Sequence, residues 1–127
     1  MKAGQKGDPR RAFGQMGERI AVKHLESKGY LIREQNYRRA EGEIDIIAET
    51  DGLVAFVEVK CRRGARMGTA AEGVTPAKQR RLVALAEAYA SEQAAGSELR
   101  IDVIAIDFAP DGRLLSLAHY ENAVTGD

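Results

Sequence analysis

The amino-acid sequence predicts an α/β fold in which two helices flank a mixed central sheet. Apolar residues recur at helical spacing between residues 13 and 25 and again between residues 79 and 90, which is typical of amphipathic helices. Shorter segments between and after them alternate apolar with polar residues, as half-buried strands do. Because the second helix separates the strand that begins near residue 99 from the earlier strands, we expect a crossover that makes this strand parallel to a neighbour.

The bulk composition suits one domain in a reducing compartment. The chain has 127 residues, no net charge and a single cysteine, Cys61, which argues against a disulfide framework. Residues 1–8 have no apolar pattern, so we expect a disordered lead followed by a single domain at residues 9–127. No apolar run approaches the roughly 20 residues of a membrane span, and the amino terminus does not resemble a signal peptide. We therefore expect a cytoplasmic protein that does not bind membranes.

Capping and turn residues predict where the elements begin and end. Asp8 and Pro9 suit the N-cap and first position of a helix that Gly29 ends. Thr75 with Pro76 begins a second helix, which ends near residue 94. The expected order is αβββαββ, with strands at Tyr30–Tyr37, in a hairpin between residues 43 and 61, at Leu99–Phe108 and at Leu114–Tyr120.

The turn signal Asp51-Gly52 lies at the centre of this hairpin. Asp-Gly between alternating apolar segments predicts a two-residue loop. With that loop, Asp45 lies opposite Glu58 and Glu43 lies opposite Lys60, all four on one face of the sheet. A three-residue loop would instead send Asp45 and Glu58 to opposite faces.

Two directly opposed carboxylates repel each other and destabilise a strand pair. A hard divalent cation such as Mg²⁺ or Mn²⁺ would offset that repulsion, because it takes oxygen ligands and uses carboxylates together with water and substrate phosphate. We therefore expect Asp45 and Glu58 to hold a cation. Lys60 would hold a water or a phosphate oxygen beside it, and Glu43 would position that lysine. The alternative is an ordinary solvated face of an antiparallel sheet.

A basic segment follows the expected cation site directly. Between residues 60 and 81 the chain has seven cations and one anion, Glu72. Lys and Arg supply most contacts with nucleic-acid phosphates, and Lys78 lies near the positive end of the second helix, where a phosphate would suit. The alternative is a solvated charged surface. The expected nucleic-acid-binding residues are Arg62, Arg63, Arg66, Lys78, Arg80 and Arg81.

Five further side chains could take part in chemistry. Glu18 falls at the edge of the apolar stripe of the first helix, so it either reaches a site on the sheet or stays in solvent. We expect a strand-edge role for Asp102 and a core-edge position for His24, whereas His119 has no partner pattern. Neither histidine is assigned a catalytic role. Cys61 is expected to be inert, because no histidine lies near it in the sequence to act as its base.

The combination of Asp45 with Glu58-Val59-Lys60 resembles the PD-(D/E)XK motif of restriction-endonuclease-like nucleases, although Ile44 stands where the motif has proline. The resemblance extends to the YraN-type family of bacterial proteins and to archaeal Holliday-junction resolvases. The other matching segments are Gly17-Glu18, Gly29-Tyr30, Asn36-Tyr37-Arg38, Gly42-Glu43-Ile44 and Lys78-Gln79-Arg80-Arg81-Leu82.

This resemblance implies a restriction-endonuclease-like αβββαβ core. It further implies that Asp45, Glu58 and the carbonyl of Val59 are metal ligands, that Lys60 is the catalytic lysine and that Glu18 is an accessory acid. We therefore expect a Mg²⁺- or Mn²⁺-dependent DNA endonuclease acting in repair or recombination, selective for branched or junction DNA and working as a homodimer. The alternative is a protein with a nuclease-like fold that binds nucleic acid or a DNA-processing partner without cutting.

Overall fold

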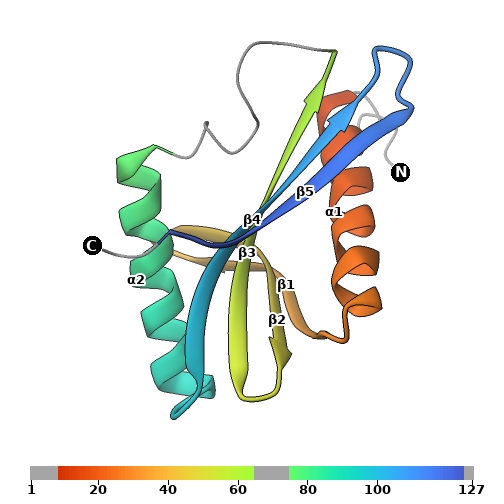
Figure 1. Ribbon diagram of the computed structural model, residues 1–127. Helices are drawn as coiled ribbons and strands as arrows, with labels where there is room; N and C mark the ends of the chain where they lie inside the picture. The colour runs from red at the N-terminus through yellow and green to blue at the C-terminus, as the bar shows by residue number, and fades with distance from the viewer. Residues whose placement is uncertain (1–8, 65–74, 125–127) are drawn as a thin grey trace, which may run out of the picture.

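The computed structural model describes residues 9–64 and 75–124 and has the expected αβββαββ order (Figure 1). The predicted lead at residues 1–8 lies outside the described residues. Six elements match their predicted bounds within two residues, whereas the last strand continues past Tyr120 to Val124. The elements are α1 (Pro9–Ser27), β1 (Leu31–Arg39), β2 (Gly42–Thr50), β3 (Leu53–Arg63), α2 (Pro76–Gln93), β4 (Glu98–Phe108) and β5 (Leu114–Val124).

The five strands form one mixed sheet in the order β1-β2-β3-β4-β5. β3 and β4 are parallel from Leu53 opposite Glu98 to Arg63 opposite Phe108, and the other neighbouring strands are antiparallel. α2 connects β3 to β4, so the predicted parallel crossover is confirmed. The fold is an α/β fold with helices flanking a mixed sheet, consistent with a restriction-endonuclease-like core.

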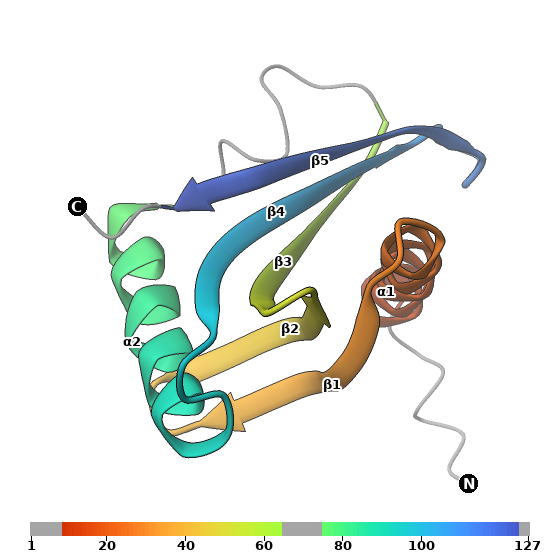
Figure 2. The ribbon, with the colours of Figure 1, turned by 60° about the horizontal axis from the view of Figure 1, so that its bottom comes forward.

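The two helices cover opposite faces of the sheet (Figure 2). On one face, Ala21 and Leu25 of α1 are fully buried against strand residues such as Val57. On the other face, Leu85 and Tyr89 of α2 are buried against a second set of strand residues. Each helix therefore uses its apolar stripe to hold the sheet. Neither helix, over the described part of the chain, has the length and apolar character needed to cross a membrane.

The turn between β2 and β3 has the predicted two-residue loop. Asp51 and Gly52 both have positive φ, 46° and 79°, as a type I′ turn requires. The strand pairing runs from Thr50 opposite Leu53 to Ile46 opposite Val57, which is the predicted register. Asp45 is therefore the first residue beyond the paired part of this hairpin.

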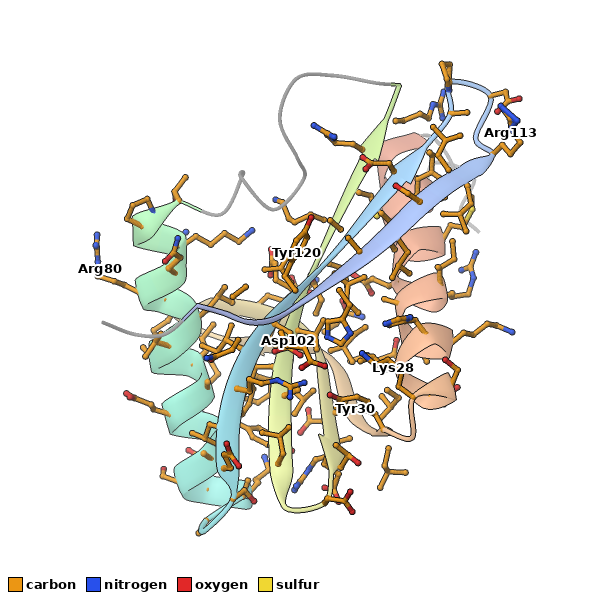
Figure 3. All side chains as sticks on the ribbon, viewed as in Figure 1. Lys28, Tyr30, Arg80, Asp102, Arg113 and Tyr120 are labelled. Atoms are coloured by element: carbon orange, nitrogen blue, oxygen red, sulfur yellow. The ribbon has the colours of Figure 1, made fainter. Side chains whose placement is uncertain are left out.

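The expectation of a strand-edge role for Asp102 was wrong. Asp102 is fully buried, on the face of the sheet that α1 covers. Its carboxylate accepts hydrogen bonds from Arg100 (2.9 and 2.8 Å), from Nε2 of His119 (2.9 Å) and from the backbone of Asn122 (2.9 Å). The last contact holds the far end of β5 and explains why that strand continues past Tyr120. Figure 3 shows Asp102 at the middle of the sheet, with Lys28 and Tyr30 on the side toward α1.

The partners of His119 were not visible in the sequence, because they come from other elements. Its ring lies between Asp102 and His24, with 3.1 Å between Nδ1 of His119 and Nε2 of His24. Burial, then the positive charges of His119 and Lys28, lower the pKa of His24. The two histidines therefore join α1 to β5.

Gly17 allows α1 to approach β3 closely. A Cβ at this position would overlap the sulfur of Cys61, whereas a Cβ at Gly14 on the same helix would meet no heavy atom within 4 Å. We expect overpacking in Gly17→Ala to cost roughly 1–3 kcal/mol, offset in part by the helix preference of alanine, so the free energy of unfolding should fall by up to about 2 kcal/mol. Gly14→Ala is expected to raise it by about 1 kcal/mol, because alanine favours the helix. Urea unfolding of both variants measures this.

The expected loss of stability in Gly17→Ala depends on overlap of the new Cβ with the sulfur of Cys61. A Gly17→Ala substitution made in a Cys61→Ala background should therefore lose its cost and behave like Gly14→Ala. An equal loss of stability with and without the sulfur would contradict the proposed contact.

Candidate active site

The candidate site lies where β2 and β3 separate. Their pairing ends at Ile46 and Val57, after which β2 stays with β1 while β3 continues with β4. At this fork the backbone N–H of Val59 donates to Oδ2 of Asp45 at 2.8 Å, so a side chain replaces the next backbone acceptor. Both polar groups of a strand residue point to the same neighbouring strand. The carbonyl of Val59 therefore also points to the side where the pairing has ended.

Two hollows meet at this fork, and Asp45 and Glu58 line both of them. The hollow on the side of α1, about 510 Å³, is also lined by Glu18, Cys61 and Arg63. We call it the α1-side hollow. The hollow on the side of α2, about 210 Å³, is also lined by Glu43, Lys78 and Arg81. We call it the α2-side hollow, and it differs from the first in having two cations in its wall.

The structure brings Asp45 and Glu58 together, as the hairpin register predicted. The pKa of Asp45 is raised to about 7, first by burial and then by the negative charge of Glu58, against the lowering effect of the Val59 N–H. Glu18 and Glu43 add to the increase. A carboxyl group with such a pKa would be ionised more readily beside a cation.

Glu18 reaches this site from α1. Burial is the main cause of its raised pKa, and the charges of Glu43 and Glu58 raise it further. A hydrogen bond with the side chain of Asn36 lowers the pKa of Glu18 but does not outweigh these effects. Of the two readings that the helix pattern left open, the structure therefore supports the one in which Glu18 points toward the sheet.

Asn36 is the residue whose role at this site sequence reasoning missed. It lies in β1 with a φ of 55°, a conformation that asparagine tolerates better than most residues. In the pairing of β1 with β2, its neighbours Gln35 and Tyr37 lie opposite Ile46 and Ile44, which places Asn36 beside Asp45. An asparagine within a strand was the available signal, because this residue is unusual there.

The predicted pairing of Glu43 with Lys60 is not formed. Glu43 lies opposite Arg38 of β1 and makes an ion pair with it, with 3.4 Å between Nε and Oε1. Lys60 lies opposite Ala105 of β4. The register is the predicted one, but the strands separate before these two residues can meet. Glu43 still lines the α2-side hollow.

A different lysine contacts Glu58. Nζ of Lys78 lies 2.5 Å from Oε2 of Glu58, whose side chain is only 6% exposed. Lys78 is in the first turn of α2, where its N–H donates to the side chain of the N-cap residue Thr75. The helix start predicted from Thr75-Pro76 therefore places this ammonium group at the site.

The expected basic segment is divided by the fold. Arg63 lines the α1-side hollow, and Lys78 and Arg81 line the α2-side hollow. Arg62 makes an ion pair with Asp107 at 3.1 Å. Arg80 points away from the sheet on the outer side of α2 (Figure 3). Arg66 lies outside the described residues.

Cys61 lines the α1-side hollow next to the acids. Burial, followed by the negative charges of Asp45 and Glu18, raises the pKa of its thiol to about 11. The thiolate needed for nucleophilic chemistry is therefore scarce at neutral pH, in agreement with the inert role predicted from the sequence.

Comparison with known proteins gives matches over most of the chain. The family model described as "Uncharacterised protein family UPF0102" matches residues 17–106. A UPF0102 protein of Symbiobacterium thermophilum is 49% identical over 82% of this chain and 89% of its own length. One from Pelotomaculum thermopropionicum is 41% identical over 91% and 98%, and one from Chloroflexus aurantiacus is 42% identical over 94% and 98%. The matched region contains every candidate site residue named above.

Proposed function

Since the chain belongs to the UPF0102 family, a family whose description states no activity, we propose from its own residues that it is a divalent-metal-dependent DNA endonuclease. The observation that carries the proposal is the geometry of the fork. There Asp45 accepts a hydrogen bond from the backbone N–H of Val59 and lies near other carboxylates, whose negative charges raise its pKa. An acid pair at the end of a strand pairing costs stability and serves no packing purpose. Binding of a cation together with a phosphodiester would explain why the acid pair is present.

The donor atoms at the fork fit Mg²⁺ or Mn²⁺. Asp45, Glu58 and the carbonyl of Val59 are hard oxygen donors, and Mg²⁺ commonly takes one or two carboxylates and keeps several waters. Within residues 9–64 and 75–124, no group of three or more His, Cys, Asp or Glu side chains is arranged so that it could hold a metal ion, and the fork offers two carboxylates and one carbonyl. The proposed site is therefore one that substrate and water complete, unlike a closed structural site.

The reaction is hydrolysis of a phosphodiester bond: a water adds to phosphorus, and the bond to the leaving sugar oxygen breaks. The bound cation would make that water more acidic and offset negative charge on the phosphate. Glu18, in the α1-side hollow, is assigned the accessory acid that orients water near the metal. Lys60 lies two residues beyond Glu58 on the same face of β3 and is assigned the charge that stabilises the phosphoryl oxygens.

The proposed substrate is DNA recognised by its backbone and shape. Both helices use their apolar faces to cover the sheet, and Arg63, Lys78 and Arg81 line the hollows beside the acids. Such cations read phosphates, which carry no sequence information directly. We propose branched or junction DNA in repair or recombination, cut by a homodimer in the cytoplasm, since two symmetrical cuts suit a two-fold axis.

The test begins with calorimetric titration of Mn²⁺ into the wild type, Asp45→Ala and Glu41→Gln. Glu41 is an exposed acid just before β2, so its variant controls for the loss of one negative charge. We expect Mn²⁺ binding to be lost only in Asp45→Ala. Cleavage of four-way-junction, single-stranded and linear duplex DNA by the same samples should fall about 100-fold or more in that variant. Undiminished cleavage by a folded Asp45→Ala protein would rule this site out.

One observation favours a second function, binding of DNA without cutting. Lys78 is already a cationic partner of Glu58, so a protein that only binds phosphates, through Arg81 and Arg63, would need no metal. Such a protein would bind DNA equally with and without Mn²⁺ and cleave none of the three substrates. The titration and cleavage measurements above separate the two functions.

A further inference from the structure

The ion pair between Lys78 and Glu58 lies where the two hollows meet, because Glu58 lines both hollows and Lys78 lines the α2-side hollow. Glu58 is buried. The side chain of Lys78 is 32% exposed and ends a flexible chain of four methylenes, so it can reach a second position at little cost. A buried carboxylate that stays charged without a partner is costly, and Lys78 is the cationic partner of Glu58 in this structure.

A divalent cation at the fork would compete with this lysine. Both would contact the Glu58 carboxylate, and two positive charges on one carboxylate repel each other. The charge of the cation would therefore weaken the contact between Lys78 and Glu58. The α2-side hollow that it lines is the nearest place for its ammonium group, and Arg81 lines the same hollow from one turn further along α2.

From these contacts we propose that the α2-side hollow is the phosphate subsite of the enzyme, with Lys78 and Arg81 as its cations, and that metal entry releases Lys78 from Glu58 to complete it. The proposal rests on the metal-dependent function above. It assigns the ligand as a phosphodiester of the DNA backbone, because two cations in one wall suit a compact anion. Metal and DNA therefore bind with positive coupling, since each favours the same position of Lys78.

The first test is the affinity for Mn²⁺. Lys78→Gln removes the competing ammonium, so we expect its Mn²⁺ dissociation constant to fall about tenfold below that of the wild type, a change within the usual range of coupling between sites. Lys78→Arg keeps the charge and is expected to stay close to the wild type. Arg80→Gln removes one positive charge from the outward side of the same helix (Figure 3) and is expected to change the dissociation constant less than twofold.

The second test is DNA binding in Ca²⁺, which takes the same oxygen ligands, with gels to check that the DNA stays intact. Fluorescence anisotropy of a labelled four-way junction gives the dependence of affinity on salt. With Ca²⁺, Lys78→Gln should reduce the slope of log K against log salt by about 1, as the loss of one phosphate contact does. Without metal the slope should not change, because Glu58 then holds Lys78.

The outcomes separate the two proposals. Wild-type protein that binds Mn²⁺ no more weakly than Lys78→Gln would overturn the role of Lys78 while leaving the metal site standing. Equal slopes for wild type and Lys78→Gln in Ca²⁺ would overturn the phosphate subsite in the same way. Wild-type protein that binds no Mn²⁺ would overturn both this proposal and the nuclease.

Discussion

Replacing Asp102 with alanine is expected to lower the free energy of unfolding by roughly 3–5 kcal/mol at neutral pH, because it breaks a buried ion pair and leaves the partners uncompensated. Asp102 is fully buried. The side chain of Arg100, which is also hydrogen bonded to the hydroxyl of Tyr30, would remain inside the protein without its carboxylate. Asn122 would lose its acceptor as well, so the end of β5 should separate from β4.

Urea unfolding followed by circular dichroism measures this loss. Asp111 in the turn before β5 is the matched control, since its carboxylate is 70% exposed, and Asp111→Ala should cost less than about 1 kcal/mol. A loss of similar size in both variants would mean that the buried network contributes little. Asp102→Asn, which keeps the acceptor but not the charge, is expected to fall between the wild type and Asp102→Ala.

The pH dependence of the same network has a definite sign. Burial alone would raise the pKa of Asp102, but hydrogen bonds from His119, Arg100 and Asn122 outweigh burial and hold that pKa below its ordinary 3.8. A carboxyl group whose pKa is lowered by folding stabilises the folded state above the unfolded value, and this contribution disappears as the pH falls through the folded value. The deficit of Asp102→Ala should therefore be constant above about pH 4 and shrink only below it.

Sequence reasoning succeeded where a local signal decided the geometry. The Asp51-Gly52 turn fixes the register of the hairpin, and the register brings Asp45 to Glu58. The cap formed by Thr75 and Pro76 fixes the start of α2 within one residue. These contacts depend on two to four consecutive residues, so a single sequence contains the information.

The rest depends on how elements far apart in the chain pack together. The register determines which residues would lie opposite each other, but not where the pairing of two strands ends. The sequence therefore could not show that β2 and β3 separate before Glu43 and Lys60 can meet. The contact of Lys78 with Glu58 needs the position of α2 over the sheet, and His119 meets His24 across 95 residues of chain. Long-range contacts of single polar side chains leave no periodic pattern that could have been read.

Asp45→Asn is expected to stabilise the protein in the absence of metal while removing the proposed nuclease activity. The pKa of Asp45 is raised to about 7 in the folded protein from an ordinary value of 3.8. The wild type is therefore most stable, relative to the variant, below about pH 4, and it loses stability as the pH rises to about 7 and Asp45 ionises among other acids. The full cost is up to roughly 4 kcal/mol. Asparagine avoids this cost because it does not ionise, and its side-chain oxygen can still accept the hydrogen bond from the N–H of Val59.

Unfolding by urea in EDTA at pH 5, 6.5 and 8 measures the difference between Asp45→Asn and the wild type. The variant should gain stability over the wild type as the pH rises, whereas Glu41→Gln, which removes an exposed acid, should show no such trend. Saturating Mn²⁺ should reverse the order at pH 8, because only the wild type gains binding energy from the cation. A variant that is less stable than the wild type by the same amount at every pH would mean that Asp45 serves only as an acceptor for Val59. The acid pair would then need no cation, and the physical reason for placing a metal at the fork would be gone.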